Sequence, residues 1–169
     1  LVTELYGTKL QQVRQRLNQL DKTGLVVQSI DIEKDKSALI EATYEWATTH
    51  DKEKYTYEDL VSPSLYLFNL MGSGRFNLYG QKVTRDNKIK AFCIYEQNQI
   101  IANEFSISAD KNIPGLSEFQ MYQMCTKLYS MGTRYVNIGG SETVGLDRFK
   151  KKFNPIISHE LCSYICKNK

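Results

Sequence analysis

Two glycines at the end of a strand mark a place where chemistry could be done, within YVNIGGSETVGLDRFKKKF at residues 135–153. Gly139 and Gly140 carry no side chains, so another backbone or a ligand can approach this strand end closely. Ser141 and Glu142 follow directly and offer a hydroxyl and a carboxylate. The pattern is compatible with a substrate-binding strand end, and also with a plain turn in which a hydroxyl caps the next helix.

The short helix predicted over residues 145–153 places one of its three consecutive lysines differently from the other two. Lys150 lies on the rim of an apolar face, so its stem can pack while its ammonium reaches over the end of the sheet. We expect Lys151 and Lys152 to face solvent. Lys150 is therefore either a packing residue or a charge that acts on a bound group. The apolar face, at spacings of three and four, consists of Leu146, Phe149 and Phe153.

A carboxylate in the first turn of another helix is the second candidate. The stretch SEFQMYQMCTKLYSM, residues 117–131, predicts an amphipathic helix, and Glu118 falls near the middle of its apolar stripe. A carboxylate near a helix N-terminus is stabilised by the helix dipole and the free N–H groups. In a cleft, partial desolvation would instead tune Glu118 for proton transfer or for holding an amine. Both interpretations stand.

Composition argues against several classes of protein. The 169 residues fit one domain, 41% are apolar, and a net charge of +3 is too mild to indicate a nucleic-acid partner by itself. No apolar run is long enough to span a bilayer, and the sequence contains no nucleotide-binding loop or metalloprotease motif. The two histidines, His50 and His159, have no nucleophile near them that would indicate a hydrolase triad. The four cysteines lie in apolar segments and lack metal-ligand spacing, so we expect free thiols and no metal site at Cys93, Cys125, Cys162 and Cys166. Free thiols in turn indicate a reducing compartment, and we expect a cytoplasmic location.

The order of the predicted elements favours an α+β fold. Apolar periodicity predicts helices at 8–20, 35–50, 57–71, 117–131 and 145–153, and strands at 24–32, 75–87, 88–98, 99–109, 134–138 and 157–167. Pro63 is expected to break into the third helix. Turns are expected at Asp86-Asn87 and Gln97-Asn98. These elements predict a mixed, mostly antiparallel sheet flanked by helices, with strands 99–109 and 134–138 side by side.

Several stretches together resemble one family. The run from the Gly-Gly strand end to GLDRFKKKFNP is similar to the end of the GNAT-like domain in phosphatidylglycerol lysyltransferases and in Fem-type peptidyltransferases, which use aminoacyl-tRNA. LYGTKLQQVRQRLNQL resembles the basic linker helix before the second GNAT half, at about residues 7–20, and YEWATTHDKEKY the Trp-bearing helix after it. IPGLSEFQMYQMCTKLYSMG resembles a helix with an acidic residue at the position of Glu118.

The resemblance implies transfer of an acyl or aminoacyl group to an amine or hydroxyl acceptor. Residues 1–169 would form a single GNAT-like domain, equivalent to the C-terminal half of a larger enzyme. The implied catalytic residues are Lys150, Glu118 and Glu142, with the lysine stabilising charge on the transferring carbonyl. The implied substrate-binding residues are Asn137, Gly139, Gly140, Ser141 and Phe149.

The same resemblance implies no tightly bound cofactor, and either aminoacyl-tRNA or acyl-CoA as the donor. The implied partners are an N-terminal GNAT-like half or an oligomeric partner, and tRNA. In a larger protein the domain would work in the cytoplasm or at the cytoplasmic face of a membrane.

Departures from the family keep two alternatives open. SADKNIPGLSE stands where CoA-dependent GNAT enzymes have a pyrophosphate loop, and NEFSISADK lacks an arginine of the lysyltransferases. The chain could therefore be a catalytically silent GNAT-like half that binds a partner, or a free-standing CoA-dependent N-acetyltransferase. A transferase needs Glu118, Glu142 and Lys150 to converge on a cleft, whereas a CoA enzyme needs free backbone N–H groups at residues 110–117.

Overall fold

A computed structural model describes residues 7, 10–49, 56–141 and 143–156. Within them, ten elements follow one another in the predicted order of helices, meander and strand–helix alternation. They are α1 (Gln11–Leu20), β1 (Val26–Ser29), α2 (Ile32–Thr48), α3 (Tyr57–Ser73), β2 (Leu78–Arg85), β3 (Lys88–Asn98), β4 (Ile101–Ala109), α4 (Leu116–Ser130), β5 (Tyr135–Asn137) and α5 (Val144–Lys151).

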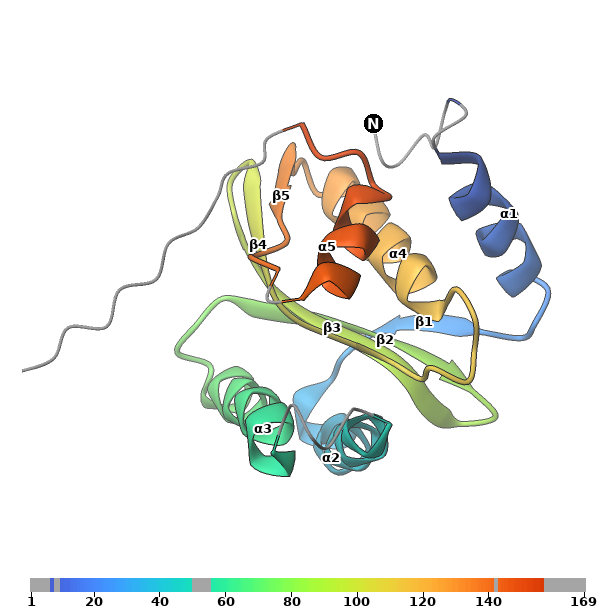
Figure 1. Ribbon diagram of the computed structural model, residues 1–169. Coiled ribbons are helices and arrows are strands. Elements are labelled where there is room, and N and C mark those ends of the chain that lie inside the picture. Colours follow the sequence, from blue (N-terminus) through green and yellow to red (C-terminus); the bar gives the residue numbers. More distant parts are fainter. Residues whose placement is uncertain (1–6, 8–9, 50–55, 142, 157–169) are drawn as a thin grey trace, which may run out of the picture.

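The strands form one sheet in the order β1-β2-β3-β4-β5. Neighbours are antiparallel except β4 and β5, which run parallel. Helices α2 and α3 cover one face of the sheet, and α1, α4 and α5 lie on the other (Figure 1). The predicted α+β class, with a mostly antiparallel sheet flanked by helices, is confirmed.

Two hairpins build the centre of the sheet. The first turn lies at Asp86 and Asn87, as predicted, and both residues have positive φ, of 53° and 60°. Asparagine and aspartate tolerate this conformation, which matches the twist of a two-residue hairpin. The prediction of the second turn is wrong by two residues: Asn98 still pairs with Ile101, so the turn lies at Gln99 and the residue after it.

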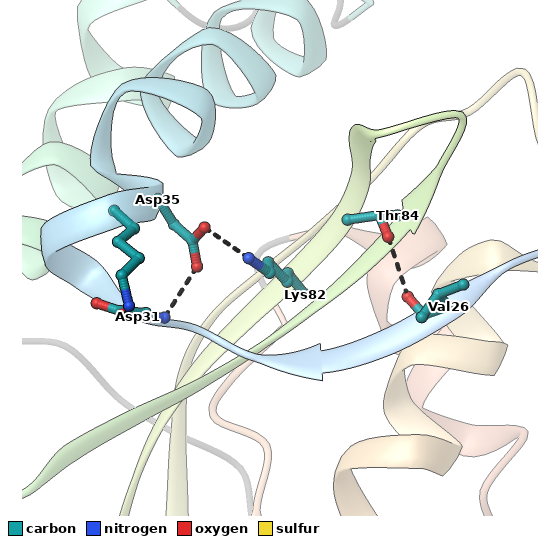
Figure 2. Close-up of polar contacts among 6 residues, drawn as sticks. Val26, Asp31, Asp35, Lys82 and Thr84 are labelled. Atoms are coloured by element: carbon teal, nitrogen blue, oxygen red, sulfur yellow. Dashed lines mark hydrogen bonds and ion pairs between the residues drawn. The ribbon is translucent and has the colours of Figure 1, made fainter.

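Helix α2 begins three residues earlier than predicted, and the strand before it is correspondingly shorter. The N–H of Asp31, at the N-cap position, donates to Oδ2 of Asp35 over 2.8 Å. The other oxygen of Asp35 accepts from Nζ of Lys82 on β2, over 2.5 Å, and both side chains are only 14% exposed. Figure 2 shows how this pair joins the start of the helix to the sheet. The ion pair thus holds the first turn of α2 against β2.

Helix α3 runs through Pro63 without a break, contrary to the prediction. Its start is stabilised by a capping box. The N–H of Asp59 donates to Oγ1 of Thr56, and the N–H of Thr56 donates to Oδ2 of Asp59. Its end is a left-handed residue, Gly74, with φ of 64°. Strong caps at both ends and burial of Phe68 hold the helix together despite the missing N–H of the proline.

Each face of the sheet has its own hydrophobic core. On the α2/α3 side, the Phe68 and Phe92 rings meet edge to face with centroids 5.5 Å apart. On the other side, buried residues of α1, α4, β3 and β4 pack together, including Leu17, Cys93 and Met124. Helix α1, predicted as a linker helix, is thus part of the second core.

Some predictions fall outside the described residues: the strand at 157–167 with His159, Cys162 and Cys166, as well as His50 and Glu142. Cys93 and Cys125 are free thiols, as expected. Among the described residues, the helices are too short or too polar to cross a membrane. No group of histidine, cysteine and acidic side chains in that part of the chain could hold a metal ion.

Candidate active site

Strands β4 and β5 lie side by side, as predicted, but only briefly. In the described chain they pair at residues 101–103 and 135–137. Beyond this point β4 pairs only with β3, and Phe105 is an extra residue, because Glu104 faces Tyr95 while the next paired residue is Ser106. Meanwhile β5 ends and the chain turns through Gly139 into α5. Within the described residues the two strands therefore part at Glu104, and no strand of that part of the chain lies beside this edge of β4 from there on.

A line of hydrogen bonds crosses the sheet where these strands part. Nδ2 of Asn103 donates to Oε1 of Glu96 over 2.7 Å, and Nδ2 of Asn137 donates to Oδ1 of Asn103 over 3.0 Å. Oδ1 of Asn137 in turn accepts the N–H of Gly139 at 3.0 Å. Asn137, predicted to bind substrate, thus orients the strand end. Asn103 was not singled out in the sequence.

Lys150 is brought to the glycine pair, as its helix phase predicted. Its Nζ donates to the carbonyl oxygen of Gly140. Gly139 has φ of 66°, a conformation that favours glycine, and a Cβ there would lie 3.9 Å from the same Nζ. The capping expected of a plain turn is present too, since Oγ1 of Thr143 accepts the N–H of Leu146 at 3.1 Å. The segment after β5 therefore both caps α5 and binds the ammonium group of Lys150.

Glu104 is a candidate functional residue that the sequence analysis missed. Burial raises its pKa to about 7, and the positive charge of Lys150 offsets this only in part. The negative charge of Glu104 adds to the effect of burial in raising the pKa of the Cys93 and Cys125 thiols. Both thiols belong to the core on the α4 side of the sheet, so the Glu104 carboxylate lies on that side too. A carboxyl group with a pKa of about 7 can both accept and donate a proton at neutral pH.

Glu118 is placed differently. Its Oε1 accepts from Nη1 of Arg16 at 2.6 Å and from Nζ of Lys152 at 2.7 Å. The carboxylate side chain is only 6% exposed, whereas the two cations are 46% and 41% exposed. Burial alone would raise the pKa of Glu118, but the hydrogen bond from Lys152 and the two positive charges hold it below its usual range. These contacts tie α1, α4 and α5 together.

The three lysines of α5 consequently have three different roles. Lys151 is exposed and pairs with Asp147 one turn earlier, over 2.7 Å, which fits the expected solvated face. Lys152 is also exposed, as expected, but α5 packs close to the start of α4 and brings its ammonium to Glu118, a contact that was not predicted. Phe149 packs edge to face on the ring of Phe153, with centroids 5.5 Å apart.

Ser141 is exposed at the strand end. The structure therefore joins Gly139 and Gly140 with Lys150. It places Glu118 in a separate ion-pair cluster.

The loop before α4 offers few N–H groups to a phosphate. Four of its N–H groups already donate hydrogen bonds within the protein. The N–H of Asp110 donates to the Lys90 carbonyl and that of Asn112 to the Asp110 carboxylate, while those of Ile113 and Leu116 donate to carbonyls within the loop. Pro114 has no N–H. A pyrophosphate cradle needs backbone N–H groups that point outward. Half of the residues at 110–117 already donate their N–H groups within the protein, so these groups cannot bind a phosphate.

Comparison with known proteins identifies the family. The family model described as phosphatidylglycerol lysyltransferase, C-terminal, matches residues 2–166, which is nearly the whole chain. The chain belongs to this family. No curated protein matches it.

Solved structures agree with the fold. A conserved protein of unknown function from Bacteroides thetaiotaomicron has a TM-score of 0.77 at 18% identity, over 92% of this chain and 53% of that one. The C-terminal domain of a candidate lysylphosphatidylglycerol synthetase from Agrobacterium fabrum has a TM-score of 0.61 at 19% identity, over 89% and 53%. An aminoglycoside acetyltransferase from an uncultured soil metagenomic sample, in complex with sisomicin, has a TM-score of 0.62 at 13% identity, over 86% and 97%.

The fold is thus GNAT-like, with acetyltransferases among its structural neighbours. The chain spans about half the length of the Bacteroides and Agrobacterium structures.

Proposed function

We propose that this chain is the C-terminal half of a transferase that moves an aminoacyl group from an ester donor to an amine or hydroxyl acceptor. Its membership of the lysyltransferase family supports this, as does its span of about half of two structural relatives. The observation that carries the proposal is Glu104, a half-buried carboxyl group with a pKa of about 7 within electrostatic reach of Lys150. Such a pair can supply a general base and a stabilising charge.

In the proposed reaction, the acceptor N–H or O–H gives its proton to the Glu104 carboxylate as its nitrogen or oxygen attacks the ester carbonyl. Lys150 exchanges its hydrogen bond to the Gly140 carbonyl for one to the developing oxyanion. A new C–N or C–O bond forms as the ester C–O bond breaks. The leaving alkoxide takes the proton from Glu104, which returns the carboxylate to its starting state.

The remaining predicted residues receive supporting roles in this scheme. Glu118 positions rather than reacts, because its Oε1 already accepts hydrogen bonds from Arg16 and Lys152 and its pKa is lowered. By holding Lys152, it keeps α5 in the place from which Lys150 reaches the glycines. We assign contact with the donor and acceptor to Asn137, Gly139, Gly140, Ser141 and Phe149. Glu142, which lies outside the described residues, stays a predicted catalytic residue.

The donor favoured by the loop before α4 is aminoacyl-tRNA rather than acyl-CoA, because four N–H groups of this loop are already bonded. Aminoacyl-tRNA is made in the cytoplasm, which places the reaction there. The missing half of the enzyme would be an N-terminal GNAT-like domain or a partner that fills its place.

The test is a pH–rate profile of the complete enzyme. In wild type, kcat/KM should rise with pH through an inflection near 7, where Glu104 loses its proton. Glu104→Gln should remove that inflection and lower the rate by about 10²–10⁴-fold, the usual worth of a general base. Glu41→Gln, an exposed acid on α2, is the matched control and should behave as wild type. Unchanged transfer in the Glu104 variant would leave the catalytically silent half as the better interpretation.

A further inference from the structure

A pocket of about 300 Å³ lies on the other side of the sheet from the Glu104–Lys150 pair. It opens between the C-terminal part of α2 and the adjoining ends of β3 and β4, on the face that α2 and α3 cover. Its volume is at the lower end of the range for small-molecule sites. The walls combine an apolar floor, including Ile89 and Phe92, with Trp46 and a few polar groups, which are Glu45, Thr48, Thr49, Lys90, Ser108, Asp110 and Asn112.

A hydroxyl without a partner lines this pocket. Ser108 is 5% exposed, and its Oγ is buried with no hydrogen bond to any described atom. Leaving a buried hydroxyl unbonded is costly, so such groups usually have a partner. A ligand that enters the pocket with a donor or acceptor at its inner end would provide one.

The residues that line the pocket carry one net negative charge, which favours a cation, although the ammonium of Lys111 lies beside the pocket. Lys90 and Asp110 form an ion pair of 3.2 Å that cancels their charges, and the second oxygen of Asp110 accepts the N–H of Asn112 at 2.9 Å. Among the described residues Glu45 takes part in no ion pair, so its carboxylate leaves the lining with one net negative charge.

The end of α2 adds to this preference. The last carbonyls of a helix carry partial negative charge. Next to the pocket, Nζ of Lys111 already donates to the carbonyl oxygen of Thr49 over 3.2 Å, although burial lowers the pKa of this lysine. The helix end thus already holds one ammonium group. Trp46, one turn from it, offers an aromatic face of the kind that attracts cations.

We propose that this pocket binds a small primary amine with a hydrogen-bonding group at its far end. The ammonium lies beside Glu45 and Trp46, and the far group bonds the Ser108 hydroxyl. Binding here requires no turnover, so it stands or falls independently of the proposed transfer reaction.

The protein reports on its own pocket, because Trp46 is the single tryptophan of the chain. Trp46 fluorescence and calorimetry would be followed with three unbranched probes of equal length: aminobutanol, butanediol and hydroxybutyrate, each substituted at both ends. Aminobutanol should change both signals saturably, and the neutral and anionic probes should not. An equal response to all three, or no saturable response to aminobutanol in either measurement, would overturn the proposal.

Variants locate the binding. Glu45→Gln should weaken aminobutanol binding about tenfold or more, the usual loss for a charged hydrogen bond, and Ser108→Ala by about fivefold. Ser108→Ala removes an unpaired group and should not lower the melting temperature. Glu41→Gln makes the same charge change one turn earlier on α2 and should alter binding by less than about twofold. Equal effects of the Glu41 and Glu45 variants would place the amine elsewhere and refute the assignment.

Discussion

Glu104, which is half-buried, and Glu118, which is buried, lie on the same side of one sheet, and their environments shift their pKa values in opposite directions. Glu118 receives hydrogen bonds from two cations, at 2.6 and 2.7 Å, and its pKa is lowered. Glu104 feels one lysine whose ammonium is engaged with a backbone carbonyl, and burial raises its pKa to about 7. Burial alone therefore does not decide what a carboxylate does. The number of cations that contact it directly separates a structural anchor from a group poised to exchange protons.

The largest effect that can sharpen this comparison is on catalysis. Lys150→Ala should slow transfer by the complete enzyme about 10²–10³-fold, which is typical of losing one oxyanion donor. Lys151→Ala should leave the rate near wild type, because Lys151 is exposed and its partner is Asp147 on the same helix. A transfer assay with both variants decides it. Equal rates would return Lys150 to a purely packing role.

The second effect is on the free energy of unfolding, whose pH dependence reports on Glu104. Its pKa is raised from 4.5 to about 7 on folding, so the folded state prefers the neutral form. Wild type should therefore lose stability as pH rises from 4.5 through 7, by up to about 3 kcal/mol at 1.36 kcal/mol per pKa unit.

Glu104→Gln should be near wild type in stability below pH 4.5 and more stable above pH 7. Denaturant unfolding across this pH range would measure the difference. A variant less stable than wild type at alkaline pH would show that the ionised carboxylate is well paired and that the comparison is wrong.

The opposite sign is expected for Glu118. Its lowered pKa means that its stabilising contribution is present above pH 4.5 and is lost as pH falls through the folded value. Glu118→Gln should cost about 2 kcal/mol at neutral pH, less than the roughly 3–5 kcal/mol for breaking a fully buried pair, because Arg16 and Lys152 are half-exposed and can turn to solvent. The difference from wild type should shrink in acid. A loss that is independent of pH would mean that packing, and not the ion pairs, holds the three helices together.

The sequence was sufficient for the fold because periodicity records which face of each element is buried. The helices and the antiparallel meander follow from local patterns of apolar residues. That β4 and β5 are neighbours followed instead from the matching strand-to-helix transitions near residues 110 and 140. The errors lie where a single tertiary contact decides. Lys82 on β2 binds Asp35 and starts α2 early, and the pairing of Asn98 with Ile101 moves the second turn.

The candidate site was predictable to the extent that it is local. Helix phase alone distinguished Lys150 from Lys151, and the glycine pair marked the strand end that it reaches. Glu104 was missed because its burial depends on the extra residue Phe105 and on the parting of two strands, neither of which has a local signature. The ion pair between Lys152 and Glu118 was missed because the position of α5 against α4 is not encoded in the phase of either helix.

The smallest effect tests the backbone that seats Lys150. Gly139→Ala should cost about 1 kcal/mol, because φ of 66° is unfavourable for a residue with a Cβ, while the space itself is open, with Nζ of Lys150 at 3.9 Å. Gly72→Ala is the matched control. It lies inside α3, its φ is not positive, and no atom lies within 4 Å of the added Cβ. There the exchange should stabilise the protein by roughly 0.5–1 kcal/mol, since alanine favours helices more than glycine does.

Thermal melts of the two variants give the sign directly, and a transfer assay shows whether the strained turn also displaces Lys150. If Gly139→Ala proved as favourable as Gly72→Ala, the turn would have relaxed out of the left-handed region. The carbonyl of Gly140 would then no longer fix where the ammonium of Lys150 points, and the difference between the Glu104 and Glu118 environments would depend on the side chains alone.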